Sequence, residues 1–231
     1  INRLVTDRLS TLLFTPSLDA NFNLIREGID GKKIHFVGNV MIDTLVQNLE
    51  KIKKQKRLDV PFNQFGVVTI HRPSNVDDLE QLKKIIVIFN NVSKKIPLVF
   101  PVHPRTRKQL RKIKDVFLNN ERIFLTQPLG YLSFLNLVYY SKLLITDSGG
   151  IQEEAPTFHV PLLVMRDRTE RPEGITANVA RLVGVKHNRI IEETTRLLTD
   201  PEAYASMTKA PNPYGDGHAS QRIVSHLLRE K

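Results

Sequence analysis

The stretch from 144 to 154, which reads LITDSGGIQEE, carries the residue types best suited to chemistry in this chain. An apolar run ends at Ser148, and Gly149 and Gly150 lead into a segment with helical potential. Glycine lets a backbone approach a ligand closely, and the first turn of a helix presents free N–H groups that suit a phosphate. These three residues therefore predict a phosphate-binding turn. The alternative is an ordinary strand–turn–helix in which Ser148 is the N-cap.

Acidic residues flank the same turn. Asp147 precedes it, and Glu153 and Glu154 lie about one helical turn beyond it. Carboxylates accept hydrogen bonds from sugar hydroxyls, so these side chains suit ribose binding better than acid–base chemistry. No lysine follows the glycine pair, which excludes a P-loop, and no Ser–His–Asp arrangement or pair of catalytic carboxylates is evident.

Basic residues gather in three other segments. His71 and Arg72 precede a proline, His103 precedes another, and the stretch MRDRTERPEG (165–174) contains Arg171. A histidine can contact a phosphate or move a proton, and arginine can supply bidentate donors to a nucleotide sugar. The alternatives are a surface pair and a solvated charged loop. A metal site is not expected, because neither histidine has carboxylates at ligand-like spacing.

Short apolar runs alternate with amphipathic stretches along the chain. The runs predict strands at 12–15, 34–37, 66–70, 98–102, 123–126, 143–146, 161–165 and 181–183. The stretches predict helices at 1–10, 18–28, 40–54, 77–94, 105–119, 131–140, 150–158, 174–179, 188–199 and 221–230. This alternation indicates an α/β fold with a parallel sheet and helices on both faces. Ligands of such sheets bind at the carboxyl ends of strands, so the basic and glycine-rich segments should line one electropositive edge.

The composition narrows the classes of partner. The formal charge is +10, from 34 basic and 24 acidic residues, and basic clusters lie at 51–57 and 105–114. These clusters read as solvated faces of helices. No nucleic-acid module is visible, and only 7% of residues are aromatic, with no tryptophan. An anionic metabolite is therefore favoured over nucleic acid as the partner. The residues alone thus predict a nucleotide-phosphate pocket and leave the reaction open.

The chain contains no cysteine, which excludes disulfides, thiolate nucleophiles and Cys-ligated zinc. No apolar run approaches the ~20 residues of a membrane span, and no signal-peptide pattern is present at the start. We therefore expect no membrane partner and a cytoplasmic location.

Five strings carry a family resemblance: VTIHRPSN, PVHPRTRK, TDSGGIQEEAP, VMRDRTERPE and NPYGDGHAS. In order and spacing they resemble the non-hydrolysing UDP-N-acetylglucosamine 2-epimerases. The resemblance implies two Rossmann-like domains in the glycosyltransferase-B architecture, and interconversion of UDP-GlcNAc and UDP-ManNAc for cell-surface polysaccharide precursors. The implied mechanism eliminates UDP to a 2-acetamidoglucal and adds it back after inversion at C2. No cofactor and no catalytic metal are implied, and the full-length protein is expected to be a homodimer.

The resemblance also implies roles for residues of the nucleotide pocket. Ser148, Gly149 and Gly150 match the diphosphate-binding turn of the family. Glu154 matches the ribose ligand, and Phe134 matches the segment around the uracil.

Further matches concern catalysis and regulation. His71 matches a catalytic histidine that steadies the departing diphosphate, and Arg171 matches an arginine near the sugar and phosphates. Arg72 and His103 match positions near an allosteric site for a second UDP-GlcNAc in bacterial members. A proline–serine pair follows Arg72 here, where the family often has Arg-Glu.

The resemblance divides the chain into residues 1–55, the end of a first Rossmann-like domain with its linker, and residues 56–231, a UDP-binding second domain. The main catalytic carboxylates of the family are expected before residue 1, so the chain alone should bind UDP and turn over little substrate. The terminal helix of the family packs back across the first domain, so in this chain it is expected to expose its apolar face. Alternatives are a hydrolysing epimerase that releases N-acetylmannosamine and UDP, a UDP-sugar glycosyltransferase, a UDP-binding module without activity of its own, and, last, a nucleic-acid-binding protein.

Overall fold

The computed structural model describes residues 1–113 and 120–229. By its internal contacts the chain forms two compact units. The first consists of Ile1–Leu49 with Asn212–Lys231, and the second consists of Glu50–Pro211. The predicted division at residue 55 refers to domains of a longer protein and stays a prediction, but residues 212–231 group with the first 49 residues and not with the second unit.

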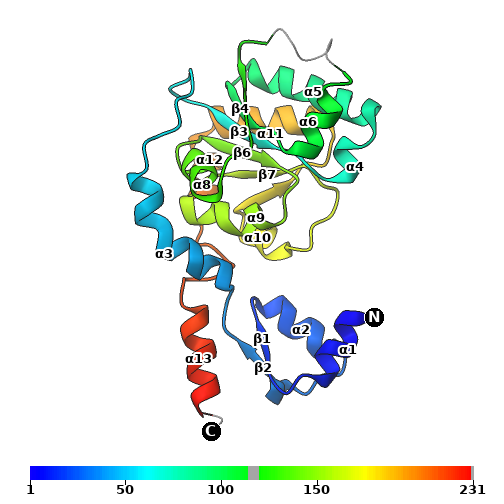
Figure 1. Cartoon of the computed structure of the whole chain (residues 1–231), viewed down its shortest axis with the longest axis vertical. Helices are drawn as coiled ribbons and strands as arrows, with labels where there is room; N and C mark the ends of the chain where they lie inside the picture. Colours follow the sequence, from blue (N-terminus) through cyan, green and yellow to red (C-terminus); the bar gives the residue numbers. More distant parts are fainter. Residues whose placement is uncertain (114–119, 230–231) are drawn as a thin grey trace. The chain divides into compact units, whose positions relative to one another are not determined.

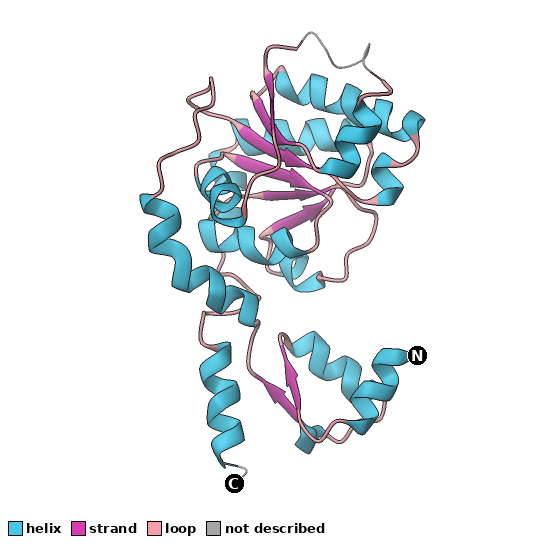
Figure 2. Cartoon of the chain, viewed as in Figure 1, coloured by secondary structure: helices cyan, strands magenta, loops and turns pink. Residues whose placement is uncertain are grey.

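The second unit is built on a six-stranded, all-parallel sheet (Figure 2). Its strands lie in the order β5 (Ile123–Thr126), β4 (Leu98–Pro101), β3 (Gly66–Thr69), β6 (Leu143–Thr146), β7 (Leu162–Val164) and β8 (Ala180–Leu182). The chain begins at β3, moves outward to β5, and then returns to β6 on the other side of β3. This reversal between β3 and β6 is a topological switch point, where doubly wound sheets bind their ligands.

One face of the sheet packs against α5 (Leu79–Ser93) and α11 (His187–Thr199) (Figure 1). Val68 of β3, Phe100 of β4 and Ile145 of β6 belong to the main apolar cluster on this side. Phe89 of α5 meets Phe100 edge to face, with ring centroids 5.8 Å apart. This face supplies most of the apolar core of the unit.

The opposite face is covered by α8 (Tyr131–Tyr139), α9 (Gly150–Glu154) and the 3₁₀ helix η2 (Ala155–Phe158) (Figure 1). Successive side chains of a strand point to opposite faces. Val67 and Leu144, which are register partners, accordingly lie outside the main cluster and are still fully buried. Both faces of the sheet are therefore covered, as the alternation of strands and helices predicted.

Four short helices of the second unit begin at a proline. They are α4 (Pro73–Val76), α6 (Pro104–Leu110), α10 (Pro172–Thr176) and α12 (Pro201–Thr208). Proline suits the first helical position, because its φ is already helical and the N–H it lacks would have no partner in the helix. The residue before each proline is therefore an N-cap, which follows a strand or loop in three cases and helix α11 in the case of α12.

The first unit is smaller. It contains α1 (Asn2–Leu9), β1 (Leu13–Thr15), α2 (Leu18–Arg26), η1 (Gly31–Lys33), β2 (Ile34–Phe36), the first part of α3 (Val40–Lys54) and α13 (Ala219–Arg229). Strands β1 and β2 form a two-stranded parallel sheet. Asp43 of α3 is buried and accepts hydrogen bonds from the backbone N–H groups of Ala219 and Ser220, at 2.9 and 2.6 Å. This carboxylate therefore holds the start of α13.

Most predicted elements are present, with ends that differ by one or two residues. Strands β5 and β6 and helix α3 have the predicted bounds. The predicted helix 105–119 ends as α6 at Leu110, and its residues 114–119 lie outside the described residues, as does residue 230 of the predicted terminal helix. The structure adds α4, η1 and α12, which the apolar pattern did not predict because each has too few apolar residues to show a helical period.

Candidate functional site

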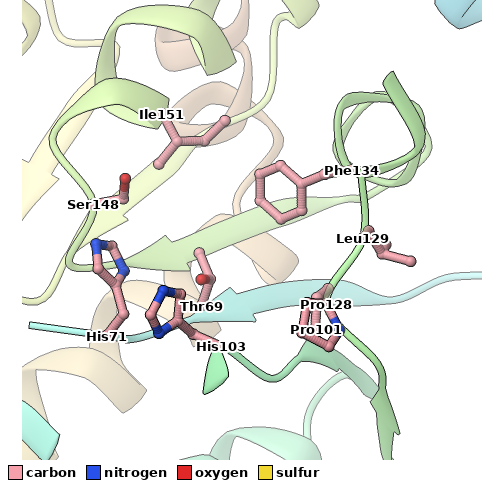
Figure 3. Close-up of a pocket in the computed structure, with 9 residues that line it drawn as sticks. All are labelled: Thr69, His71, Pro101, His103, Pro128, Leu129, Phe134, Ser148 and Ile151. Carbon is pink, nitrogen blue, oxygen red and sulfur yellow. The ribbon is translucent and has the colours of Figure 1, made fainter. Parts of the chain in front are cut away.

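An open cavity of about 220 Å³ lies at the carboxyl ends of β3, β4, β5 and β6, beside the switch point (Figure 3). We call it the switch-point cavity. Three predicted site residues, His71, His103 and Ser148, reach it from the ends of three different strands, and Phe134 reaches it from α8. The other lining residues are Thr69, Pro101, Pro128, Leu129 and Ile151. The predicted convergence of strand ends is therefore confirmed for these residues.

Three predicted site residues are N-caps of the proline-initiated helices. Arg72 precedes α4, His103 precedes α6 and Arg171 precedes α10. Proline disfavours the helical conformation in the residue before it, so each of these residues has a non-helical backbone. In each case the proline thus ends the preceding strand or loop at the N-cap residue, and the side chain of that residue is a candidate for ligand contact.

Asp147 lies at the centre of the site and is fully buried. Its carboxylate accepts hydrogen bonds from the backbone N–H groups of His71, at 3.1 Å, and Arg72, at 3.0 Å, and from Nδ2 of Asn75 at 3.0 Å. These bonds join the end of β3 to the end of β6. The interpretation of Asp147 as a ribose ligand is therefore wrong, because its carboxylate is closed off from solvent and binds the protein's own backbone.

The same carboxylate orients the imidazole of His71. Nδ1 of His71 lies 3.2 Å from Oδ1 of Asp147. A carboxylate acts only as an acceptor, so this contact favours a proton on Nδ1 and leaves Nε2 for a ligand. Figure 3 shows His71 beside Ser148 and His103 at the cavity. Asp147 thus fixes both the backbone position and the ring orientation of His71.

His103 is arranged in the opposite way. Its Nδ1 accepts a hydrogen bond from the backbone N–H of Arg105 at 3.2 Å, so Nε2 carries the proton of the neutral ring. Burial and the nearby ring of His71, 5.3 Å away between centroids, lower the pKa of His103. At neutral pH His103 is therefore an uncharged donor. Arg105 itself does not line the cavity and forms an ion pair with Asp77, at 2.9 and 2.8 Å.

The glycine turn differs in part from the prediction. Ser148 lines the cavity, but the N-cap of α9 is Gly149, so the interpretation of Ser148 as the N-cap is wrong. Helix α9 has five residues, so its dipole is small, and Gly150 is its first residue. The guanidinium of Arg171 covers Gly149, because a Cβ placed there would lie 3.0 Å from Nη1 of Arg171. A larger residue at position 149 would therefore require the guanidinium of Arg171 to shift.

Arg171 is tied to the turn by a second contact. Its Nε donates a hydrogen bond to Oε1 of Glu153 at 2.6 Å, and Glu153 is buried. This ion pair satisfies the carboxylate of Glu153 within the protein, so the idea that Glu153 binds ribose is not supported by its contacts. The pair places a guanidinium directly beside the Ser148–Gly150 turn.

Glu154 is also buried, and its Oε1 accepts a hydrogen bond from the hydroxyl of Tyr131 at 2.8 Å. Burial raises the pKa of Glu154, and the hydrogen bond from Tyr131 opposes that effect only in part. Burial likewise raises the pKa of Tyr131. Glu154 is not one of the residues that line the switch-point cavity, so its role as a ribose ligand stays a prediction.

The apolar wall of the site was predicted only in part. Pro128 and Leu129 follow β5 and belong to the segment QPLGYLSF (127–134) around Phe134, which the resemblance matches to the uracil. Pro101, the last residue of β4, and Ile151, which follows the glycine turn, were missed, and their position at a strand end and beside the turn was the available signal. In the described part of the chain, no three histidine or carboxylate side chains lie close enough together to hold a metal ion. None of the described helices is both long and apolar enough to cross a bilayer.

A family profile described as UDP-N-acetylglucosamine 2-epimerase matches residues 1–228. The chain belongs to this family. The resemblance to UDP-N-acetylglucosamine 2-epimerases seen in the five sequence strings is thereby confirmed. The fold class is confirmed as well: a Rossmann-like parallel sheet with helices on both faces, in proteins of the glycosyltransferase-B type.

Relatives and solved structures of the epimerase family agree with this assignment. The UDP-N-acetylglucosamine 2-epimerase of Methanococcus maripaludis is 37% identical over 240 residues, which cover all of this chain and 64% of the relative. The Escherichia coli enzyme is 38% identical, with the same coverage. The chain thus spans less than two thirds of the length of the curated relatives it matches.

Two crystal structures show the same fold with ligands. The Methanocaldococcus jannaschii epimerase in complex with UDP-GlcNAc and UDP has a TM-score of 0.86 and 35% identity, over 99% of this chain and 64% of that one. The Neisseria meningitidis epimerase bound to UDP-GlcNAc has a TM-score of 0.82 and 37% identity, over 99% and 63%.

Proposed function

We propose that this chain is the uridine-nucleotide-binding part of a non-hydrolysing UDP-N-acetylglucosamine 2-epimerase, which interconverts UDP-GlcNAc and UDP-ManNAc for cell-surface polysaccharide precursors. The observation that carries the proposal is the convergence of His71, His103, Phe134 and Ser148 on one cavity at the switch point. We further propose that the longer protein acts in the cytoplasm as a homodimer.

The roles of the residues follow from their places around the cavity. Phe134 offers an aromatic face on which a uracil can stack. Ser148 and the adjoining Gly149–Gly150 backbone bind the diphosphate, with the guanidinium of Arg171 beside them. Glu154 binds the ribose, which requires that a ribose hydroxyl share or replace the hydrogen bond from Tyr131.

The proposed reaction breaks the bond between C1 of the sugar and the diphosphate oxygen, and removes the proton from C2. The electron pair of the C1–O bond leaves with UDP, so negative charge develops on the diphosphate, and the C2–H pair becomes the C1=C2 double bond of 2-acetamidoglucal. UDP then adds back to C1, and a proton adds to the opposite face of C2. His71 contacts this oxygen through Nε2, while Asp147 holds Nδ1 and stabilises positive charge on the ring. The base that removes the C2 proton is expected in the part of the relatives that this chain does not span.

Calorimetric titration of UDP into the purified chain tests the nucleotide site. We expect binding, and we expect Phe134→Ala to weaken it about tenfold because a base-stacking surface is lost. His71→Ala should also weaken binding, whereas His187→Ala, at the exposed start of α11, should leave it unchanged. If folded protein gives no heat with UDP, or if both histidine variants behave alike, the proposed site is wrong.

The type of reaction is tested by its products. With UDP-GlcNAc as substrate, proton NMR should show little turnover by this chain alone, and any product should be UDP-ManNAc. Free N-acetylmannosamine together with UDP would identify the hydrolysing alternative. Rapid epimerisation by the chain alone would contradict the view that essential residues lie outside it.

A further inference from the structure

Gln152, the third residue of α9, is a buried polar residue with only 1% of its surface exposed. It is not one of the residues that line the switch-point cavity, so any effect it has on a ligand there must act through other residues. Both ends of its amide form hydrogen bonds within the protein, and both lead to the proposed diphosphate site. A buried polar group with all its partners in place holds those partners in one arrangement.

The nitrogen of this amide binds the turn. Nε2 of Gln152 donates a hydrogen bond to the backbone carbonyl of Ser148 at 2.8 Å. The peptide bond between Ser148 and Gly149 is trans, and in a trans peptide group the C=O and the N–H point in opposite directions. Because the carbonyl of Ser148 is turned toward Gln152, the N–H of Gly149 is turned away from it. Among the described residues this N–H has no hydrogen-bond partner, so it is available to a ligand.

The oxygen of the amide binds the loop that carries Arg171. Oε1 of Gln152 accepts a hydrogen bond from the hydroxyl of Thr169 at 2.8 Å, and Oγ1 of Thr169 accepts one from the backbone N–H of Arg171 at 3.1 Å. Three hydrogen bonds in sequence therefore connect the carbonyl of Ser148 with the amide of Arg171. We call this chain of bonds the Gln152 relay.

Arg171 is thus attached to α9 at two points, by two consecutive residues of that helix. The Gln152 relay fixes its backbone, and the carboxylate of Glu153 accepts a hydrogen bond from its Nε at 2.6 Å. The guanidinium between these attachments lies against Gly149. An arginine that is held in place before a ligand arrives loses less conformational freedom when the ligand binds.

We propose that Gln152 and Thr169 are positioning residues of the nucleotide site, which present the Gly149 amide and the Arg171 guanidinium together to the diphosphate. The two donors come from different segments of the chain, and the relay aligns them. This inference rests on the proposed function and adds to it the residues that act through the turn and the arginine.

The relay should act on the phosphates alone. Phe134 and Glu154, the residues proposed for the uracil and the ribose, form no part of it. Loss of the relay should therefore weaken the binding of UDP and leave the binding of uridine, which has no phosphate, unchanged. A general loss of folded structure would instead weaken the binding of both ligands equally.

Proton NMR titrations of the purified chain with UDP and with uridine measure the two affinities. Gln152→Met keeps the length of the side chain and removes both hydrogen bonds of the amide. We expect it to weaken UDP binding about tenfold and to change uridine binding by less than about twofold.

The hydroxyl of Thr169 is tested in the same titrations. Thr169→Val should weaken UDP binding about threefold, whereas Thr169→Ser, which keeps the hydroxyl, should bind UDP within about twofold of the wild type. Thr194→Val is the matched control, because Thr194 is a buried residue of α11 whose hydroxyl has no partner among the described residues. It should bind both ligands as the wild type does.

A double variant tests whether the two residues belong to one relay. Either substitution breaks the same chain of bonds, so Gln152→Met combined with Thr169→Val should weaken UDP binding no more than Gln152→Met alone. Hydrogen exchange at the Arg171 amide reports on the relay without nucleotide and should be faster in both single variants.

The inference is overturned if Gln152→Met weakens UDP and uridine equally or weakens neither, if the two losses add in the double variant, or if exchange at the Arg171 amide stays unchanged. It is also overturned if Thr169→Ser behaves as Thr169→Val does, or if Thr194→Val does. A wild-type chain that binds neither UDP nor uridine would contradict the proposed function and the inference with it. The wild-type titration thus tests the proposed function, and the comparison of variants tests the relay separately.

Discussion

Both units of this chain contain parallel strands and helices, but they differ in how completely their apolar side chains are buried. The second unit covers both faces of six parallel strands, and the apolar residues of its central strands β3 and β6 are fully buried. The first unit has only two parallel strands, and many of its large apolar side chains are exposed, among them Leu9, Leu18, Phe22, Ile25, Phe36, Val224 and Leu228. Two-stranded sheets are marginal in water, and parallel ones are normally covered on both faces. The two units therefore differ in the burial of their apolar side chains and not in the types of secondary structure they contain.

The largest expected effect comes from a pair of phenylalanines. Phe100→Ala in the core of the second unit should destabilise that unit by about 3–5 kcal/mol, because it leaves a cavity against Phe89. Phe22→Ala in the first unit should change stability by less than about 0.5 kcal/mol, because the side chain is 62% exposed. Urea unfolding followed by hydrogen exchange in each unit measures both. Equal losses would show that Phe22 is buried in solution.

Substitution of two buried aspartates, one in each unit, should give a second and smaller difference in stability. Asp147→Asn should cost about 3 kcal/mol, because an amide cannot accept the bonds from His71, Arg72 and Asn75 together. Asp43→Asn should cost about 1 kcal/mol, as for the loss of a helix cap, because it holds only two N–H groups.

The two losses can be told apart by hydrogen exchange. Asp147→Asn should increase exchange at the ends of β3 and β6, and Asp43→Asn only at the start of α13. If Asp147→Asn left His71 in the same NMR-determined tautomer, the orienting role of that carboxylate would be refuted.

Two glycines of the second unit differ in the space around them: the guanidinium of Arg171 lies against Gly149, whereas nothing lies close to Gly130. Gly149→Ala should weaken UDP binding about threefold, a cost of under 1 kcal/mol by the usual conversion, because Arg171 must move away from the turn. Gly130→Ala, where a side chain would meet nothing within 4 Å, is the matched control and should have no effect. Calorimetry of UDP binding compares the two. If both variants bound UDP with unchanged affinity, the proposed role of Arg171 in the nucleotide site would be wrong.

The smallest effect concerns two ion pairs with exposed carboxylates, one in each unit. Hydrogen bonds from Arg222 lower the pKa of Asp216 to about 2, as those from Arg166 do for Glu170. A lowered carboxylate pKa stabilises the fold above the unfolded-state value and loses that contribution as the pH falls through about 2. Arg222→Met should raise the pKa of Asp216 towards 3.8 and leave that of Glu170 unchanged.

Carbon-13 NMR titration of the side-chain carboxyls measures both pKa values. The change in stability should stay under about 1 kcal/mol because the pair is exposed. A pKa of Asp216 that does not move would show that Arg222 is not its partner in solution.

Much of the fold could be predicted from the sequence because the signals are local. Strands β5 and β6 and helix α3 have the predicted bounds, since their apolar residues follow a regular pattern that ends at polar or glycine residues. Helix α12 was missed although Asp200 followed by a proline is a strong start signal. The carboxylate of Asp200 accepts hydrogen bonds from the backbone N–H groups of Glu202 and Ala203, which confirms the cap. Its apolar residues are too few to give a period.

The candidate site was predictable only in part. His71, His103 and Ser148 could be grouped because parallel strands end at one edge of a sheet, so topology brings distant residues together. The partners of Asp147 and Glu153 could not be predicted in this way. Both carboxylates resembled ligand-binding groups, but each is satisfied by donors far away in the sequence.

The sequence by itself determined the order of strands and helices, the family, and which residues follow the ends of strands, because periodicity, proline positions and motif spacing are properties of neighbouring residues. Only the tertiary structure decided which of these polar groups face a cavity and which bind one another. The distinction depends on the positions of donors such as the His71 and Arg72 amides, 76 and 75 residues away from Asp147, and only the packed sheet sets those positions.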